Sequence, residues 1–282
     1  MAMVTTQQML TDAQQKGYAV GAFNIENMEM AQAVISAAEK MHAPVILQTT
    51  PTTVKYAKPR VFSEMVKAIA SEAMIPVAMH LDHGESFEAA MRAFHDGYTS
   101  IMIDGSKLPF EDNVALTRSV VTVCHSSGIP VEAELGCIGG KEDSHVSLDS
   151  IYTDPDMAAL FTEQSGADFL AVAIGTAHGV YKGKPKLDIP RLKQIREKVS
   201  KPLVLHGTSG IADDVVKECI RNGICKVNYA TDLRIAFTKG VKEVMEQTPD
   251  VFDPKKYNAR GRALVENYVM ERMEVLGCRD QA

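Results

Sequence analysis

Short apolar runs alternate along the chain with segments whose apolar residues recur every three or four positions. Eight runs fit short buried strands, at residues 19–24, 43–49, 76–82, 100–104, 130–136, 168–175, 202–207 and 226–231. Nearly all of them lack a strict alternation of polar and apolar residues, which is typical of parallel strands buried on both faces. We therefore expect each run to form one strand of a parallel sheet.

The segments between these runs have the period of amphipathic helices. In residues 28–41, Met30, Val34, Ala37 and Met41 share one helical face. Thr5 and Gly17 are expected to begin and end a first helix, ahead of the first strand. Further helices are predicted at 59–73, 86–96, 110–125, 153–166, 190–198, 213–221, 235–247 and 264–276.

Eight strands that alternate with helices predict a closed (β/α)8 barrel, the TIM barrel of the α/β class, as a single domain over residues 1–282. The main alternative is an open doubly wound sheet. That fold would more naturally have fewer strands and a glycine fingerprint after the first, where this chain has Asn24-Ile25-Glu26-Asn27. The extra C-terminal helices are expected to wrap the barrel or to reach a neighbouring subunit.

Composition and charge narrow the class of function. The net charge is −6 and no cluster of lysine and arginine occurs, which argues against binding to nucleic acid or to a membrane surface. No apolar run approaches the roughly eighteen residues of a membrane span. The five cysteines form no CxxC pair, as in proteins with reduced thiols. We therefore expect a cytoplasmic protein.

Active sites in barrels of this class lie at the C-terminal ends of the strands. The residues that end or follow the predicted strands are polar: Asn24, Asp82, His83, Asp104, Glu134, His178, His206, Asn228 and Thr231. Three histidines from three strand ends, with carboxylates between them, predict an open metal site that leaves a position for substrate. His80 lies deeper and is interpreted as a hydrogen-bonded core histidine.

Two loops carry glycine or hydroxyl residues from a strand into a helix. They are Gly207-Thr208-Ser209-Gly210 and Asn228 to Thr231. Loops after the seventh and eighth strands of a barrel, which meet helix N-termini, are where phosphate binds in this fold. The alternative is a pair of ordinary helix caps. Phosphate binding is favoured because both loops carry such residues into a helix N-terminus, and because this acidic chain needs a local site for an anion.

The segment 136–149 is long for a connection between a strand and a helix. Such loops are usually functional lids or are disordered. Gly139 and Gly140 would let the loop close over a substrate and deliver a carboxylate from Glu142 or Asp143. A solvated charged tip is the alternative.

Together these residues resemble a known family over essentially the whole chain, the class II ketose-bisphosphate aldolases, which are metal-dependent barrel enzymes. The matching blocks are Asp82-His83-Gly84, Glu134-Leu135-Gly136, Gly175-Thr176-Ala177-His178-Gly179, His206-Gly207-Thr208-Ser209-Gly210 and Lys226-Val227-Asn228. Within the family the chain is most similar to the tagatose-1,6-bisphosphate aldolases, through Phe23-Asn24-Ile25, residues 171–179 and Asn228-Tyr229-Ala230-Thr231.

The resemblance implies a zinc ion held by His83, His178 and His206. Asp104 and Glu134 match acidic positions where a second or displaced ion can sit. The implied cradle for dihydroxyacetone phosphate consists of Gly179, Gly207, Thr208, Ser209, Asn228, Tyr229, Ala230 and Thr231, with Asn24 also on the substrate. A monovalent cation, Na+ or K+, is often bound there in the family.

The resemblance also implies the chemistry. In cleavage, Asp82 takes the proton of the C4 hydroxyl, the C3–C4 bond breaks, and zinc stabilises the resulting enediolate as a Lewis acid. Glu142 then protonates the carbanion, which yields dihydroxyacetone phosphate and glyceraldehyde 3-phosphate. In condensation the roles reverse.

The chain departs from the family pattern at three places. Fructose-specific relatives usually have an aspartate at the position of Ala230, so the alanine weakens the fructose interpretation. The arginine for the distal phosphate is one residue off; Arg260 is the candidate, with Arg279 behind it. Tyr229 is larger than the expected residue, which predicts a cradle of different shape.

Other readings remain open. The substrate could be fructose 1,6-bisphosphate or the phospho-deoxyketo-gluconate of the inositol pathway. A Schiff-base aldolase would need a lysine at an apolar strand end, whereas Lys107, Lys182 and Lys226 are predicted in loops or at a strand start. The chain could also be a non-catalytic partner subunit. We expect a homodimer or homotetramer, with a second, non-catalytic subunit as a further candidate partner.

Overall fold

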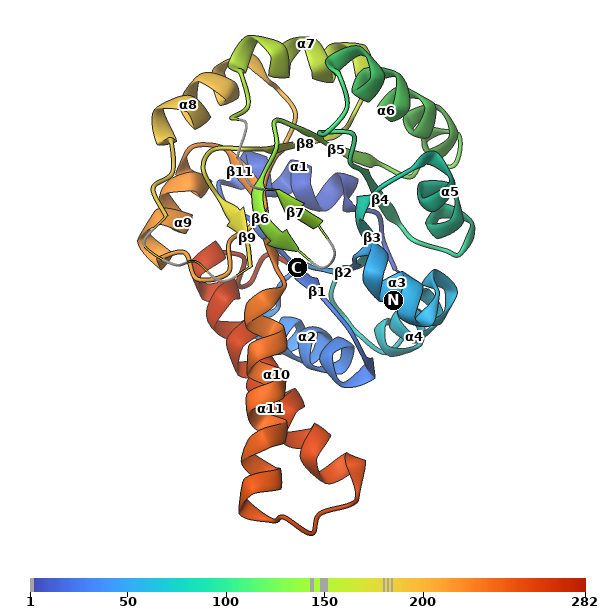
Figure 1. Cartoon of the computed structure of the whole chain (residues 1–282), viewed down its shortest axis with the longest axis vertical. Helices are drawn as coiled ribbons and strands as arrows, with labels where there is room; N and C mark the ends of the chain where they lie inside the picture. The colour runs from blue at the N-terminus through green and yellow to red at the C-terminus, as the bar shows by residue number, and fades with distance from the viewer. Residues whose placement is uncertain (1–2, 143–144, 148–151, 180, 182, 184) are drawn as a thin grey trace.

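The computed structural model describes residues 3–142, 145–147, 152–179, 181, 183 and 185–282, and within them eight parallel strands close into a barrel (Figure 1). Around the barrel the order is β1-β11-β10-β8-β5-β4-β3-β2. The strands are β1 (Val20–Asn24), β2 (Val45–Thr49), β3 (Val77–Gly84), β4 (Ser100–Ile103), β5 (Val131–Leu135), β8 (Phe169–Val172), β10 (Leu203–Leu205) and β11 (Ile224–Tyr229). The predicted TIM barrel is confirmed.

Helices surround the barrel, as the alternating pattern predicted. They are α1 (Thr6–Lys16), α2 (Met28–Met41), α3 (Pro51–Ala57), α4 (Pro59–Ala70), α5 (Phe87–His95), α6 (Phe110–His125), α7 (Pro155–Ser165), α8 (Ile189–Lys198), α9 (Asp213–Arg221), α10 (Thr231–Gln247) and α11 (Pro254–Leu276). The short helix α3 was not predicted. Helices α10 and α11 begin earlier than expected. The start of α11 is explained by Pro254, since proline suits the first helical position, and by the Asp253 carboxylate, which caps the helix.

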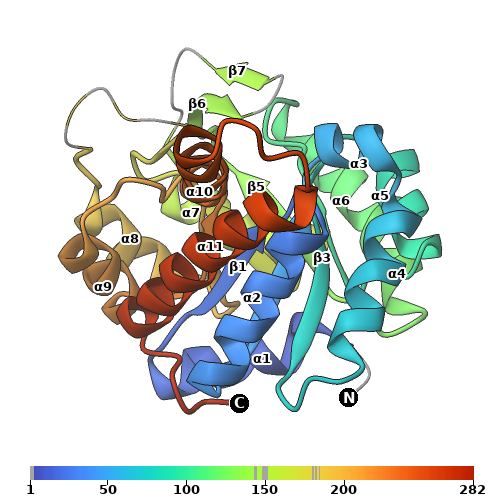
Figure 2. The ribbon, with the colours of Figure 1, turned by 90° about the horizontal axis from the view of Figure 1, so that it is seen from below.

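The two ends of the barrel are covered differently. Helix α1 lies across the N-terminal end of the barrel (Figure 2), and its Leu10 is fully buried. At the opposite end β6 (Gly139–Glu142), β7 (His145–Ser147) and β9 (Ala177–His178) form a second, three-stranded sheet. The prediction of one irregular loop at 136–149 was therefore wrong in part, because β6 pairs with β9 in parallel and with β7 in antiparallel fashion.

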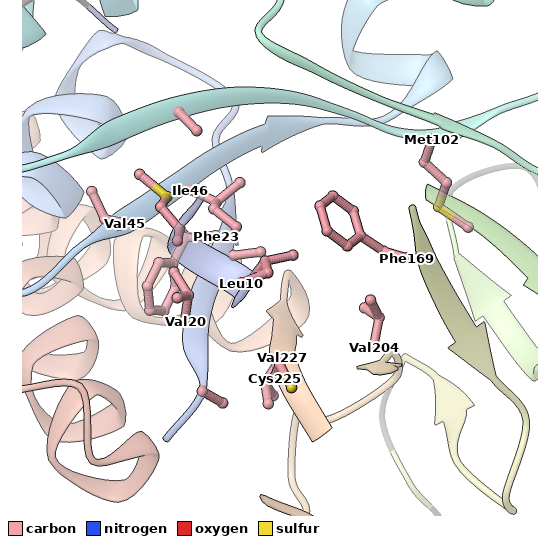
Figure 3. Packing of buried hydrophobic residues seen from close by; sticks show 14 of the residues in the cluster. Leu10, Val20, Phe23, Val45, Ile46, Met102, Phe169, Val204, Cys225 and Val227 are labelled. Carbon is pink, nitrogen blue, oxygen red and sulfur yellow. The ribbon is translucent and has the colours of Figure 1, made fainter. Parts of the chain in front are cut away.

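The apolar core fills the space around and inside the strands (Figure 3). Phe23 of β1 stacks on Tyr229 of β11, with ring centroids 5.7 Å apart. The barrel interior also contains polar side chains that are fully buried, among them His80, Glu132 and Lys226. The interior of this barrel is therefore partly polar, and each of these groups needs a partner inside it.

Helices α10 and α11 form a hairpin that extends beyond the barrel (Figure 1). They touch at two glycines: a Cβ on Gly240 would lie 2.7 Å from the Cα of Gly261. Helix α11 packs beside α2 (Figure 2), where Arg262 Nη1 donates to Gln32 Oε1 at 3.0 Å. No helix among the described residues is long and apolar enough to span a membrane.

The contact at Gly240 generates a prediction about stability. We expect Gly240→Leu to lower the free energy of unfolding by ~1–3 kcal/mol, because the new side chain would force α10 and α11 apart. Lys239→Leu, at the exposed neighbouring position, is the matched control and should change it little. Urea denaturation followed by circular dichroism measures both, and equal stability of the two variants would contradict the close-contact interpretation.

Candidate functional site

The centre of the site is built by an irregularity in β3. Successive side chains of a regular strand point to opposite faces, so Asp82 and His83 should not both face the interior. The pairing of β3 with β4 shifts between Leu81 and Gly84, and His83 has a positive φ of 50°. Gly84 is required at this irregularity, because a Cβ there would lie 2.5 Å from the backbone oxygen of Met102. The shift brings Asp82 and His83 into one site.

Three histidines from different strands meet above this irregularity. His83, at the end of β3, has its ring centroid 5.1 Å from that of His178, the last residue of β9. Its Nε2 lies 2.9 Å from Nδ1 of His206, which directly follows β10. One ring nitrogen from each histidine lies within 4.8 Å of the others. The structure thus brings the three predicted metal ligands together.

The hydrogen bonds of two of these rings indicate which nitrogens carry protons. His83 Nδ1 lies 2.8 Å from Asp104 Oδ2, and His206 Nε2 lies 2.9 Å from Glu132 Oε1. Because ionised carboxylates only accept, we assign a proton to each of these nitrogens. The two nitrogens that face each other at 2.9 Å then both present lone pairs, an arrangement that suits a shared cation. The donor set therefore fits a metal ion, and imidazole ligands suit zinc.

Burial favours the neutral form of two of the three rings, and the neutral form is the one that binds metal. Burial lowers the pKa of His178 and of His206 well below the usual range, and the neighbouring His83 lowers both further. Neutral imidazole is the ligand form of histidine, so no proton has to leave either ring before a cation binds.

Asp104 and Glu134 form a second group with His83, in which the ligand atoms also lie within 4.8 Å of one another. Burial raises the pKa of Glu134 well above its usual value, and the charge of Asp104 adds to this effect. For Asp104 burial acts in the same direction, but hydrogen bonds with His83 and Ser106 outweigh it and hold the pKa well below its usual range. The two predicted acidic residues thus lie next to the histidine cluster, with opposite protonation tendencies.

Amide side chains hold the Asp82 carboxylate on both oxygens. Asn24 and Gln48 each donate to Oδ2 at 3.0 Å, and Asn228 donates to Oδ1 at 3.1 Å. The Asp82 residue is 1% exposed. Asp82 Oδ1 also lies 4.0 Å from His83 Nε2, beside the candidate metal position. An acceptor held in this way is suited to take a proton from a group bound to the metal.

The predicted phosphate residues line one pocket next to this cluster. It is bounded by His178, Gly179, Gly207, Thr208, Ser209, Asn228, Ala230 and Thr231. Helix α10 begins at Thr231, and its N-cap residue Ala230 makes no side-chain cap. The N-terminus of α10 therefore adds its partial positive charge to the pocket, which suits an anion.

Some predicted residues lie elsewhere. The Tyr229 ring packs between Phe23 and Tyr268, and its side chain does not line the pocket. Arg260 lies on the α10–α11 hairpin, where its Nε donates to Glu243 at 2.8 Å. Glu243 is twelve residues beyond Thr231, or about 18 Å along the helix. The side chain of Glu142 and all of Asp143 lie outside the described residues.

Several residues that support the site were not predicted from the sequence. Gln48 is the second-last residue of β2. Glu132 lies two residues before Glu134, so the period of two in β5 would have placed both glutamates on one face. Lys226 was predicted at a strand start, which is wrong: it is inside β11 and fully buried. Lys107 is exposed, and Lys182 lies outside the described residues. Arg234, in the first turns of α10, donates to Glu26 at 2.8 Å.

Comparison with known proteins points to one family. Residues 4–281 match the family model described as "Fructose-bisphosphate aldolase class-II". The fructose-bisphosphate aldolase of Thermus caldophilus is 45% identical over 301 aligned positions, which cover 98% of each chain. The crystal structure of the YdjI aldolase from Escherichia coli K12 superposes with a TM-score of 0.89 at 39% identity, covering 99% of both chains.

The histidine cluster generates a prediction about metal binding. Zinc-loaded His206→Ala should lose most of its metal on dialysis, because losing one of three imidazoles should weaken binding by more than the roughly 100-fold seen for supporting residues. The control is His95→Ala, whose side chain is 83% exposed. Elemental analysis of zinc per chain is the measurement. Retention of zinc by His206→Ala at the wild-type level would exclude this residue as a ligand.

Proposed function

The chain belongs to the class II fructose-bisphosphate aldolase family, and we propose that it reversibly cleaves tagatose 1,6-bisphosphate to dihydroxyacetone phosphate and glyceraldehyde 3-phosphate. The family makes the protein an aldolase, a carbon–carbon lyase that acts on a phosphorylated ketose. The observation that favours tagatose is Ala230 at the rim of the phosphate pocket, where a side chain able to bind a sugar hydroxyl would favour fructose.

Class II aldolases depend on zinc, and we assign His83, His178 and His206 to hold the ion in this chain. A bound zinc ion supplies Lewis acidity for the negative charge that develops on the carbonyl oxygen of the substrate. Asp104 and Glu134 would accommodate a second or displaced ion. Two observations support these assignments: the ligand atoms within each group lie close together, and imidazole and carboxylate groups are metal donors.

Asp82 is the proposed base for cleavage. It takes the proton of the C4 hydroxyl as the C3–C4 bond breaks, so that C4 becomes the aldehyde carbon and the electron pair of the bond remains on the C3 side. The amides of Asn24, Gln48 and Asn228 keep its carboxylate in one orientation during this transfer. Glu142 is the proposed acid that then delivers a proton to C3. In condensation each proton moves in the opposite direction.

The pocket beside the cluster is the proposed site for the phosphate on C1. Backbone and hydroxyl groups of Gly179, Gly207, Thr208 and Ser209 would bind its oxygens, together with the start of α10. We propose that a monovalent cation, Na+ or K+, binds in the same cradle. For the distal phosphate we propose Arg234 as a candidate beside Arg260. Arg234 lies in the first turns of α10 beside Thr231, whereas Arg260 lies along the hairpin.

Fructose 1,6-bisphosphate is the second candidate substrate. It is favoured by the name of the Thermus caldophilus relative, a fructose-bisphosphate aldolase. The inositol-pathway substrate remains a third candidate, and a non-catalytic role is disfavoured because Asp82 and the three histidines converge. We further propose a cytoplasmic homodimer or homotetramer. Whether a second, non-catalytic subunit is needed is answered by the activity of the purified chain.

The substrate assignment predicts the outcome of one assay. We expect triose phosphate to be released faster from tagatose 1,6-bisphosphate than from fructose 1,6-bisphosphate. A chelator should abolish both reactions and added zinc should restore them, because the metal ion contributes several kcal/mol to the transition state. Faster cleavage of fructose 1,6-bisphosphate would overturn the tagatose assignment, and cleavage that survives chelation would overturn the zinc mechanism.

Asp82→Asn is the matched variant for that assay. It keeps a side chain of the same shape, so zinc content should stay near the wild-type level, while kcat falls by about 10²–10⁴ because the base is lost. Wild-type turnover in Asp82→Asn would remove Asp82 from the proton transfer.

Ala230 provides a separate test of the sugar preference. We expect Ala230→Asp to lower the ratio of kcat/KM for tagatose to kcat/KM for fructose bisphosphate by about tenfold. A hydrogen bond from a sugar hydroxyl to a carboxylate is worth about 1.5–3 kcal/mol, and about 1.4 kcal/mol corresponds to tenfold. Ala230→Asn is the uncharged control of similar size. An unchanged ratio in Ala230→Asp would show that this position does not select the sugar.

A further inference from the structure

A buried ion pair crosses the barrel interior beneath the proposed zinc site. Lys226 Nζ on β11 lies 2.9 Å from Glu132 Oε2 on β5, and both side chains are 0% exposed. Two strands, β10 and β8, separate β11 from β5 in the barrel wall. Such pairs are expensive to desolvate and can often be replaced by apolar residues without loss of stability. The contribution of this pair to stability therefore does not explain its presence.

One side of the pair contacts a proposed metal ligand. Glu132 Oε1 accepts a hydrogen bond from His206 Nε2 at 2.9 Å. Lys226 Nζ lies 2.9 Å from the other carboxylate oxygen, so Oε1 is left to accept from the ring and we assign the proton to Nε2. The other nitrogen of the ring, Nδ1, is then free of a proton and faces His83. Glu132 thus determines both the tautomer and the orientation of the His206 ring.

The other side of the pair contacts the support of the proposed base. Lys226 Nζ donates to Asn228 Oδ1 at 2.9 Å. This contact fixes which way the Asn228 amide points, because only the oxygen can accept from an ammonium. The amide nitrogen is left to donate to Asp82 Oδ1 at 3.1 Å. A single ammonium group therefore connects the zinc ligand His206 with the base Asp82.

We propose that Glu132 and Lys226 are positioning residues, which together set the tautomer of His206 and the direction of the Asn228 amide. Neither residue belongs to the candidate metal groups, and neither lines the phosphate pocket. This inference rests on the proposed function, but the quantity that it mainly predicts is the affinity for the metal ion. Residues that hold the outer nitrogen of a metal-binding histidine typically change affinity by about 10–100-fold.

The test compares three variants with the wild-type protein. Glu132→Gln keeps the shape but removes the charge, and Glu132→Leu combined with Lys226→Met replaces the pair by apolar side chains. Tyr98→Phe is the matched control, because it removes one buried hydrogen bond, between Tyr98 and Thr49 at 2.7 Å, away from this network. The readouts are Zn2+ affinity by competition with a chelator, the absorption spectrum of the Co2+-loaded protein, and urea denaturation of the metal-free protein.

We expect Glu132→Gln and the double variant to bind Zn2+ about 10–100-fold more weakly and to show an altered Co2+ spectrum, while Tyr98→Phe matches the wild type. The metal-free double variant should unfold at a urea concentration close to that of the wild type. Wild-type Zn2+ affinity in both Glu132 variants would overturn the proposal, as would the failure of both to fold. Neither metal readout needs a sugar, so a wrong aldolase assignment would appear separately, as lack of cleavage by the wild-type protein.

The Lys226 half of the proposal has its own kinetic readout. Lys226→Met should lower kcat for the better of the two sugars at least tenfold while KM changes little, because the misdirected Asn228 amide affects the base and not the phosphate pocket. A rise in KM at unchanged kcat would place the effect in substrate binding and overturn this half.

Discussion

A strand normally turns successive side chains to opposite faces, and the whole site depends on the one place where β3 breaks this rule. The shifted register between Leu81 and Gly84 and the positive φ of His83 place a carboxylate and an imidazole from adjacent residues in one interior. In a regular strand one of the two would face the surrounding helices, away from the ligand groups that the described residues bring together. The positive φ of His83 therefore accompanies the turn in β3 that sets the proposed base, Asp82, beside the proposed metal ligand, His83.

Much of the fold and part of the site could be predicted from the sequence. Strand ends in a parallel barrel converge at one end, so the polar residues that follow apolar runs had to meet, and His83, His178 and His206 do. Side-chain direction was hard to predict in most of the buried strands, because apolar residues occupy both faces, whereas β5 alternates and its period of two was not used. Hence Glu132 and Lys226 were missed, and Tyr229 was placed in the cradle although its neighbour Asn228 faces the interior. Strand β6 was missed because its partner β9 is distant in sequence.

The comparisons and the geometry define different parts of the function. Family membership defines the reaction class, and the convergence of donors in this chain agrees with a metal-dependent lyase. The choice of sugar is a separate question, which we propose is settled at the lining of the pocket, where Ala230 lies. The proposed positioning pair beneath, with Lys226 between Glu132 and Asn228, would be independent of that choice, because it contacts the proposed metal ligand His206 and the support of the proposed base, which every candidate substrate would use.

The small sheet over the barrel mouth has a consequence for cooperativity. Gly140 of β6 pairs in register with His178 of β9, and the backbone of Glu142 follows two residues later, within about 7 Å along the strand. The segment that carries the proposed acid is therefore attached by main-chain hydrogen bonds to a proposed metal ligand. Any cation that holds His178 in place also favours this position of β6, and by thermodynamic reciprocity a substrate that fixes β6 tightens the binding of the cation. The metal ion and the substrate are thus expected to bind with positive cooperativity, each raising the affinity for the other.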